Sequence, residues 1–122
     1  MTVTFEDFEK LEIRIGRILS CERIEGTDRL LKLSVDLGSI GENESEEQDS
    51  KSARNIRQIV SGIAQFYSPE DLVNKQCPFI VNLEPRKFKG VESWGMILAV
   101  GVDDKAVLLH PDKEVPEGSK VK

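Results

Sequence analysis

Apolar and polar residues alternate in several short stretches of this chain, and such alternation predicts β-strands. Leu31, Leu33, Val35 and Leu37, for example, are separated by single residues that are mostly polar. The stretches 11–24 and 30–38 are predicted as strands by this criterion, and 56–64, 77–83 and 95–102 are predicted as three further strands. In the first stretch the parity of the apolar positions slips near Gly16, which predicts a β-bulge there.

Two further stretches carry helix-start signals rather than alternation. In "TFEDFEKL", Thr4 is a good N-cap, and Glu6 and Asp7 suit the positive end of a helix dipole. In "SPEDLVNK", Ser68 is followed by Pro69, which fits the first helical position. We therefore expect a short N-terminal helix and a second short helix between the third and fourth strands.

The order of these elements predicts an all-β domain. Several short strands separated by turn signals, with one helix between strands three and four, are typical of a five-stranded OB-fold barrel. A C-terminal extension follows the last strand. A β-sandwich is the alternative architecture.

Length and charge add one feature to this picture. The 122 residues suit a single domain, 1–122, with a net charge of −5. Residues 39–55, between the second and third strands, hold five acids against two cations, while the remainder carries 15 cations against 17 acids. We expect a flexible acidic loop insertion at 39–55, and the nearly neutral remainder leaves room for a basic face.

Few residues in the sequence suit catalysis or metal binding. Cys21 and Cys77 stand far apart without a CxxC motif, and His110 is the one histidine. The sequence contains neither a phosphate-binding P-loop motif nor a dinucleotide-binding glycine motif. We expect no catalytic activity, no cofactor and no metal, with both cysteines acting as small apolar residues.

The sequence also favours a cytoplasmic protein. Apolar runs are too short to span a membrane, and "MTVTFEDFEK" lacks the cationic start and apolar centre of a signal peptide. We therefore expect a soluble protein that does not interact with membranes.

One short stretch concentrates positive charge. Arg86, Lys87 and Lys89 stand within four residues, beside Pro85 and Gly90. Such a run either forms a solvated loop or binds phosphate, because cations gain affinity for nucleic acid by releasing its counterions.

Three segments, "FEDFEKLEIRIGRILSCERIEGTDRLLKLSVDLG", "RQIVSGIAQFYSPEDLVNK" and "NLEPRKFKGVESWGMILAV", resemble the tRNA-binding domain related to the C-terminal region of bacterial methionyl-tRNA synthetases. The resemblance covers residues 5–122 apart from 39–55. It is greatest to free-standing homodimeric proteins that bind tRNA by its shape. It implies an OB-fold that grips the corner of folded tRNA.

The resemblance also implies a set of tRNA-binding residues by position in the matching motifs. These residues are Lys32, Arg57, Ser61, Asn82, Arg86, Lys87, Lys89, Ser93 and Met96. Each of several assignments has an alternative. Lys32 and Arg57 are otherwise ordinary exposed strand residues, Ser61 has a purely conformational role, and Met96 packs in the core. Trp94 stands at a position that the family leaves variable, where it either stacks on RNA or covers apolar surface.

The function implied is non-catalytic, structure-specific tRNA binding, by a trans-acting helper or a beta-type chain of methionyl-tRNA synthetase. The partners implied are tRNA, a second copy of the chain, and an aminoacyl-tRNA synthetase. A CsaA-like export chaperone, which binds unfolded polypeptide, is the alternative. The basic residues 85–89 favour RNA, whereas an exposed patch of Phe88, Trp94 and Met96 would favour peptide.

The resemblance implies dimerisation through the terminal segments. Val107, Leu108 and Leu109 either pack against the barrel or lie across a two-fold axis, and the sequence leaves both packings open.

Overall fold

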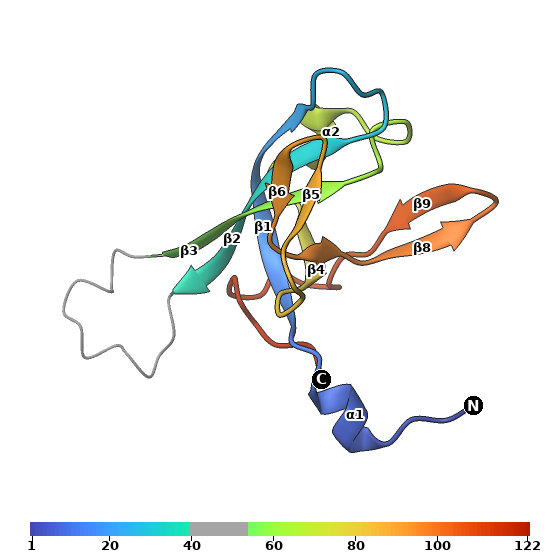
Figure 1. The fold of residues 1–122 in the computed structure, drawn as a ribbon. Helices are drawn as coiled ribbons and strands as arrows, with labels where there is room; N and C mark the ends of the chain where they lie inside the picture. The colour runs from blue at the N-terminus through green and yellow to red at the C-terminus, as the bar shows by residue number, and fades with distance from the viewer. Residues whose placement is uncertain (40–53) are drawn as a thin grey trace.

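The structure, a computed structural model, describes residues 1–39 and 54–122, and its centre is one curled antiparallel sheet (Figure 1). Its strands follow the order β3-β2-β1-β4-β7. Their bounds are β1 Ile13–Arg23, β2 Leu31–Ser39, β3 Arg54–Ser61, β4 Gln76–Ile80 and β7 Met96–Ile97. The prediction of an all-β fold of OB type is confirmed, with the core inside one curled sheet instead of between two stacked sheets.

The acidic segment predicted as a loop insertion at 39–55 lies mostly outside the described residues. Its ends belong to strands, since Ser39 closes β2 and Arg54 and Asn55 open β3. Ser39 is paired with Arg54 in the ladder between these two strands.

The core is built from the inward side chains of alternating strand positions. Leu31, Leu33 and Val35 of β2 are fully buried against Ile59 of β3 and Phe79 of β4. This is the face that the alternation in the sequence predicted. On the other parity of β2, Lys32 and Ser34 remain partly exposed, whereas Asp36 and Gly38 are buried.

Gly16 allows β1 to pass close to the core. A Cβ atom at this position would lie 2.5 Å from Cγ1 of Val35 and 2.8 Å from Cδ2 of Leu37. Burial along β1 changes parity at this glycine, but the register shift between β1 and β2 falls between Ile18 and Ser20. The bulge predicted near Gly16 is therefore displaced toward the C-terminus, because Gly16 itself still pairs regularly with β4.

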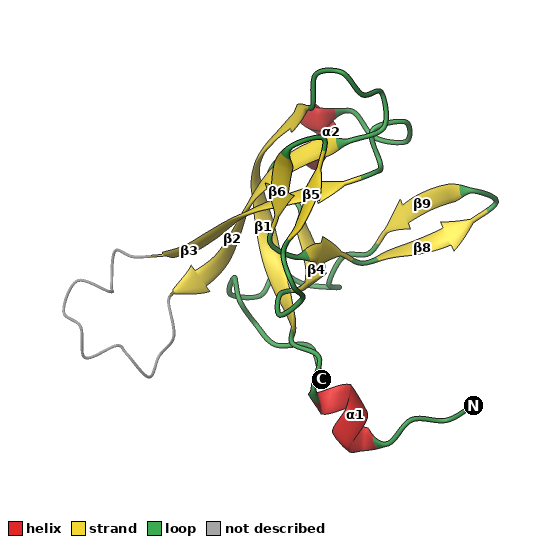
Figure 2. Ribbon diagram, in the orientation of Figure 1, coloured by secondary structure: helices red, strands yellow, loops and turns green. Residues whose placement is uncertain are grey.

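Both predicted helices are present (Figure 2). In α1, Phe5–Glu9, the Thr4 hydroxyl accepts the N–H of Asp7 at 3.0 Å, and the Asp7 carboxylate accepts the N–H of Thr4 at 3.3 Å. In α2, Pro69–Leu72, the side chain of Leu72 is buried in the core. Neither these helices nor any other in the described ranges has the length and apolar character of a membrane span.

The predicted strand 95–102 divides into two elements. β7 pairs with β4, whereas β8, Ala99–Val102, pairs with β9, Lys105–Leu108, in a hairpin that projects from the barrel (Figure 1). The single-strand prediction was wrong because the run is apolar throughout. Alternation cannot reveal where a chain leaves one partner strand for another.

The C-terminal extension returns to the first strand. The N–H of Ile15 donates to the carbonyl of Ser119 at 2.8 Å, and the N–H of Val121 donates to that of Ile13 at 2.8 Å. Arg17 anchors the same segment, because its Nε donates to Glu117 at 2.7 Å and its Nη2 to Glu114 at 3.1 Å. The extension thus covers the edge of β1 that β2 leaves unpaired.

We expect Glu117→Gln to lower the free energy of unfolding by about 1 kcal/mol at pH 7, since it removes a partly buried charge-assisted hydrogen bond. The guanidinium of Arg17 lowers the pKa of Glu117. The ion pair therefore adds stability above the unfolded pKa of about 4.3, and this contribution is lost as the pH falls through the lowered folded pKa.

Urea unfolding at pH 7 and pH 3 measures this difference. Glu114→Gln is the matched control, because the Glu114 side chain is 79% exposed and its pair with Arg17 should contribute little. Equal effects of the two substitutions at pH 7, or a Glu117→Gln effect undiminished at pH 3, would contradict the assignment.

Candidate nucleic-acid interface

The basic cluster lies on a β-hairpin formed by β5, Arg86–Phe88, and β6, Val91–Ser93. Lys89 and Gly90 form its turn with φ angles of 53° and 80°, the left-handed pair that favours a tight two-residue hairpin. This left-handed conformation is unfavourable for Lys89, which has a Cβ atom, whereas Gly90 adopts it without steric cost. The sequence predicted the cluster but not the hairpin, because two three-residue strands are too short for alternation to show.

The three cations of this hairpin are exposed to solvent. Among the described residues none of the three lies within ion-pair distance of a carboxylate. The guanidinium of Arg86 lies over the ring of Phe88, with Cζ 4.9 Å from the ring centroid. This contact orients Arg86 without neutralising it.

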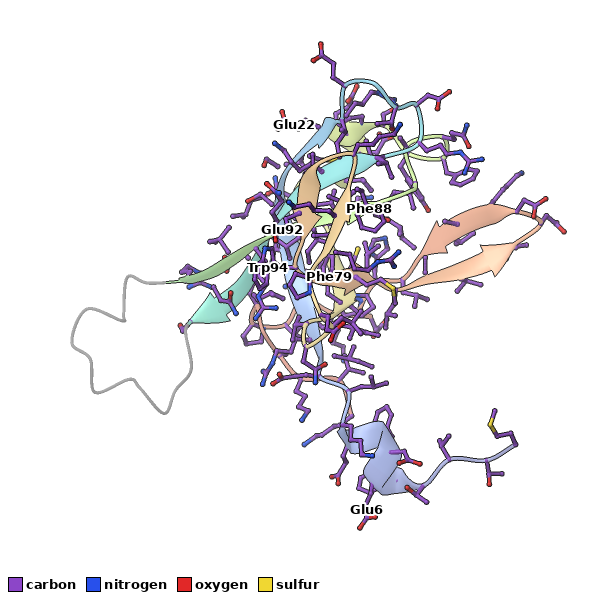
Figure 3. The ribbon with its side chains drawn as sticks, in the orientation of Figure 1. Glu6, Glu22, Phe79, Phe88, Glu92 and Trp94 are labelled. Atoms are coloured by element: carbon purple, nitrogen blue, oxygen red, sulfur yellow. The ribbon has the colours of Figure 1, made fainter. Side chains whose placement is uncertain are left out.

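Cross-strand pairing gives the hairpin two faces. Arg86 lies opposite Ser93 and therefore shares its face, while Lys87 lies opposite Glu92 on the other face. Figure 3 shows Phe88 and Trp94 on opposite sides of the hairpin. We call the face that carries Arg86 the inner face and the face that carries Lys87 the outer face.

A cleft of about 190 Å³ borders the inner face. It brings together four of the residues predicted from the sequence: Ser61, Arg86, Ser93 and Met96. Leu83, Glu84 and Phe88 also line it, and sequence reasoning did not assign them to the site. Met96 is 43% exposed, so it does not pack in the core.

Ser93 holds the hairpin against the barrel. Its side chain is only 3% exposed, and its hydroxyl oxygen accepts the N–H of Val60 at 2.9 Å. The same hydroxyl donates to the carbonyl of Gly95 at 3.0 Å. With its hydroxyl engaged on both sides, Ser93 fixes the position of the cleft, and its contact with tRNA stays a prediction.

A second hollow lies at the hairpin tip, where Lys89 faces residues 26–30 of the loop that joins β1 to β2. This loop contributes the exposed Arg29. The hydroxyl of Thr27 fixes the loop by accepting the N–H groups of Arg29 and Leu30 at 3.1 and 3.0 Å. Arg29 was not predicted, because only the fold brings it beside a residue 60 positions later in the chain.

Lys32 and Asn82 lie outside both hollows. Lys32 is on β2, where its Nζ pairs with Glu22 at 2.8 Å. Asn82 accepts the N–H of Glu12 at 2.8 Å and donates to the carbonyl of Lys10 at 2.7 Å, which ties the end of α1 to the barrel. Both residues therefore stabilise the fold through these bonds, and their contact with tRNA stays a prediction.

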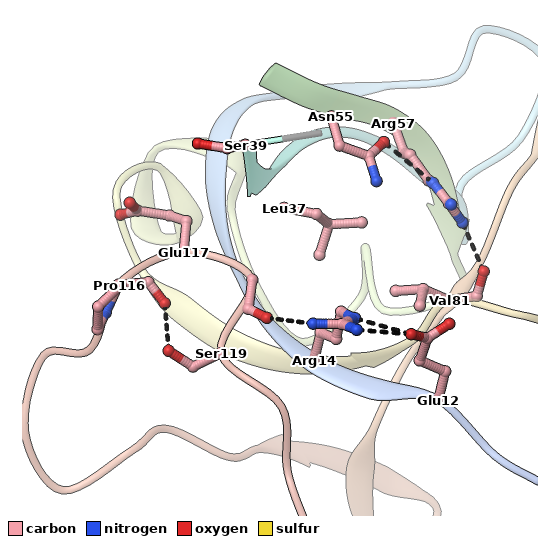
Figure 4. A pocket seen from close by; sticks show the side chains of 11 residues that line it. Glu12, Arg14, Leu37, Ser39, Asn55, Arg57, Val81, Pro116, Glu117 and Ser119 are labelled. Atoms are coloured by element: carbon pink, nitrogen blue, oxygen red, sulfur yellow. Dashed lines mark hydrogen bonds and ion pairs between the residues drawn. The ribbon is translucent and has the colours of Figure 1, made fainter. Parts of the chain in front are cut away.

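Arg57 lines a polar cavity of about 440 Å³ at the open end of the barrel (Figure 4). Its Nη1 donates to the carbonyls of Val81 and Trp94, and its Nε donates to the side chain of Asn55. Across the cavity Arg14 is bound to Glu12. Arg57 therefore joins β3 to the segments on either side of the hairpin without lining the inner-face cleft.

The remaining reactive groups are buried or isolated. Burial raises the pKa of both Cys21 and Cys77 to about 11, so neither thiol is ionised at neutral pH. Sγ of Cys77 lies 3.7 Å from Nδ1 of His110. Within residues 1–39 and 54–122 there is no group of three metal-ligating side chains arranged to hold an ion.

Comparison with known proteins extends these observations. The family model described as a putative tRNA-binding domain matches residues 13–120. The chain is also 49% identical over 119 residues to a methionine–tRNA ligase from Archaeoglobus fulgidus, an alignment that covers 98% of this chain and 16% of that protein. The chain thus spans about a sixth of the length of the relative it matches.

Two solved structures are similar over nearly their full length. A MetRS-related protein from Pyrococcus horikoshii is 36% identical with a TM-score of 0.83, and the match covers 100% of this chain and 99% of that one. The chaperone CsaA from Bacillus anthracis is 29% identical with a TM-score of 0.79, covering 100% of each chain.

We expect Ser93→Ala to lower the free energy of unfolding by about 1 to 3 kcal/mol, because the buried N–H of Val60 loses its acceptor. Ser61→Ala is the matched control in the same cleft. The described residues provide no hydrogen-bond partner for its hydroxyl, so it should change stability by less than about 0.5 kcal/mol. Urea unfolding of both variants tests this, and equal effects would contradict the positioning role of Ser93.

Proposed function

Because this chain belongs to the family of tRNA-binding domains, we propose that it binds folded tRNA through the β5–β6 hairpin and catalyses no reaction itself. The observation that carries the proposal is the exposed set of Arg86, Lys87 and Lys89 on a rigid hairpin, without a carboxylate partner among the described residues. Structured RNA is bound largely through its phosphates and 2′-hydroxyls, which such cations suit.

Local charge explains how an acidic chain can do this. The net charge is −5, but the loop 26–30 places Arg29 across a hollow from Lys89 at the hairpin tip. Two loops that present cations from opposite sides suit a bent phosphate backbone. Glu84 and Glu92 lie nearer the base of the hairpin, and Asp28 lines the same hollow as Arg29, so the excess of positive charge comes from the three hairpin cations and not from the loop 26–30.

The role we propose is delivery of tRNA to an aminoacyl-tRNA synthetase, with methionyl-tRNA synthetase as the first candidate. The relative from Archaeoglobus fulgidus carries the matching region as 16% of a methionine–tRNA ligase. A domain that holds the body of the tRNA raises the effective concentration of its acceptor end near the enzyme. This holds whether the domain acts in trans, as a beta-type chain, or within a longer chain.

Binding of unfolded polypeptide is the second candidate, favoured by the similarity to CsaA. Trp94 and Met96 are 45% and 43% exposed, which fits an apolar binding surface. However, Met96 lines the inner-face cleft whereas Trp94 lines a different hollow, and the ring of Phe88 is half-buried beneath Arg86. The apolar side chains therefore do not form the continuous patch that a peptide requires, and RNA is favoured.

We expect replacement of Arg86, Lys87 and Lys89 by alanine to weaken tRNA binding and its salt dependence together. Each phosphate-contacting cation removed should reduce the slope of log K against log salt by roughly 0.7 to 0.9. Titration of the wild type and the triple variant with total tRNA at several salt concentrations measures both quantities.

Two other ligands complete this experiment, an unstructured RNA of equal length and an unfolded polypeptide. The proposal predicts that folded tRNA binds more tightly than either. Preference for the polypeptide would favour the chaperone function, and unchanged tRNA binding by the triple variant would remove the hairpin from the site. Lys75→Ala, at an exposed position just before β4, controls for loss of a cation elsewhere.

We also propose that the chain forms a homodimer through the β8–β9 hairpin. Val100 lies opposite Val107, and Val102 follows two positions later, so three exposed valines share one face of a hairpin that projects from the barrel. Leu108 is buried against the barrel, which leaves this face uncovered in a single chain. A second copy would bury it and double the basic surface offered to tRNA.

Val107→Asp should weaken the dimer at least tenfold, because it places a charge in an apolar interface. Sedimentation equilibrium of wild type and variant over a range of concentrations measures the dissociation constant. Leu19→Asp on β1, similarly exposed at 41%, is the control. A monomeric wild type, or a dimer equally weakened by both substitutions, would contradict this interface.

A further inference from the structure

Trp94 is held firmly at its polar atoms while its ring stays exposed. Its backbone N–H donates to the carbonyl of Gln58 at 2.9 Å, and its own carbonyl accepts from Arg57 at 3.3 Å. The indole N–H donates to Oε1 of Glu92 at 3.2 Å. The side chain is nevertheless 45% exposed, so a large aromatic surface faces solvent from a fixed position.

The ring lines a shallow hollow of about 290 Å³ together with Ile56, Arg57 and Gln58 of β3. Ile56 is 46% exposed beside it. The hollow therefore combines the indole ring and the Ile56 side chain with polar groups of β3, and the guanidinium of Arg57 makes no ion pair within the described residues. A flat, partly apolar ligand with polar edges fits these surroundings.

Lys87 is on the same side of the hairpin as this hollow. It lies opposite Glu92, whose carboxylate accepts a hydrogen bond from the indole of Trp94. Lys87 therefore belongs to the outer face, and Figure 3 shows Glu92 and Trp94 beside each other. An aromatic plane beside a cation is the arrangement with which proteins bind a nucleotide of an unpaired RNA segment. The ring stacks on the base while the cation binds the phosphate.

We propose that Trp94 stacks on an unpaired base of the bound RNA, so that the binding surface continues from the hairpin cations across the outer face. The proposal rests on the proposed function of tRNA binding. It gives the outer face a role that differs from that of the other cations. Arg86 and Lys89 neutralise phosphates by charge alone. Trp94 instead requires a base that is not stacked on its neighbours in the RNA.

Fluorescence provides a direct test, because Trp94 is the only tryptophan in the sequence. We expect total tRNA to quench its emission and to reduce its collisional quenching by acrylamide. A blunt RNA duplex of similar length, which has no unpaired bases in its body, should bind by charge and leave both signals nearly unchanged. Equal changes with the two RNAs would overturn the proposal.

Substitution separates stacking from charge. Trp94→Ala should weaken tRNA binding by about 5- to 150-fold, the range given by loss of one base–aromatic stack. The salt slope should stay unchanged, whereas Lys87→Ala should reduce it by roughly 0.7 to 0.9. Trp94→Phe, which keeps an aromatic ring, should recover most of the affinity. Urea unfolding of both Trp94 variants checks that their folds are intact.

Phe66→Ala is the matched control, since Phe66 is an aromatic exposed to a similar extent, at 38%, but does not line the hairpin hollows. It should bind tRNA as the wild type does. If Trp94→Ala also binds as the wild type does, stacking is refuted while tRNA binding through the cations still holds. If the wild type does not bind tRNA at all, the proposed function fails and this inference fails with it.

Discussion

The seam between β3 and the segment 92–94 is the contact on which the arrangement of the site depends. Gln58 binds this segment twice, because its side chain donates to the carbonyl of Glu92 at 2.8 Å and its carbonyl accepts the N–H of Trp94 at 2.9 Å. The buried hydroxyl of Ser93 accepts the next N–H of β3, that of Val60. Without these bonds β3 would be an open sheet edge and the basic hairpin would have no fixed direction.

This seam explains how a three-residue hairpin can serve as a rigid binding element. An isolated two-stranded hairpin is marginally stable in water. Here the hairpin is fixed to β3 through the hydrogen bonds of Ser93 and Gln58, so the turn needs no stabilising role of its own. Cations can then occupy the tip, where Lys89 adopts a left-handed conformation in the turn. The hairpin loses its conformational entropy when the chain folds, so ligand binding does not have to order it.

Much of the fold and part of the site could be predicted from the sequence. Alternation in β1 and β2 marked the core face, Thr4 as an N-cap marked the start of α1, and the density of cations around Arg86 marked the basic cluster but not the hairpin that carries it. The position of the β1 bulge and the division of 95–102 could not be predicted, because both depend on which strand pairs with which. Hydrogen-bonding partners distant in the chain leave no periodic signal in the local sequence.

The sequence by itself determined the class of fold, the family and the chemical character of the site, because side-chain polarity and local turn preference are properties of neighbouring residues. Only the tertiary structure decided which predicted residues work together. It grouped Ser61, Arg86, Ser93 and Met96 around one cleft and brought Arg29 to Lys89. It gave Asn82 and Ser93 their hydrogen-bonding roles within the fold, since a hydrogen bond requires two groups within about 3 Å and chain separation does not specify that distance.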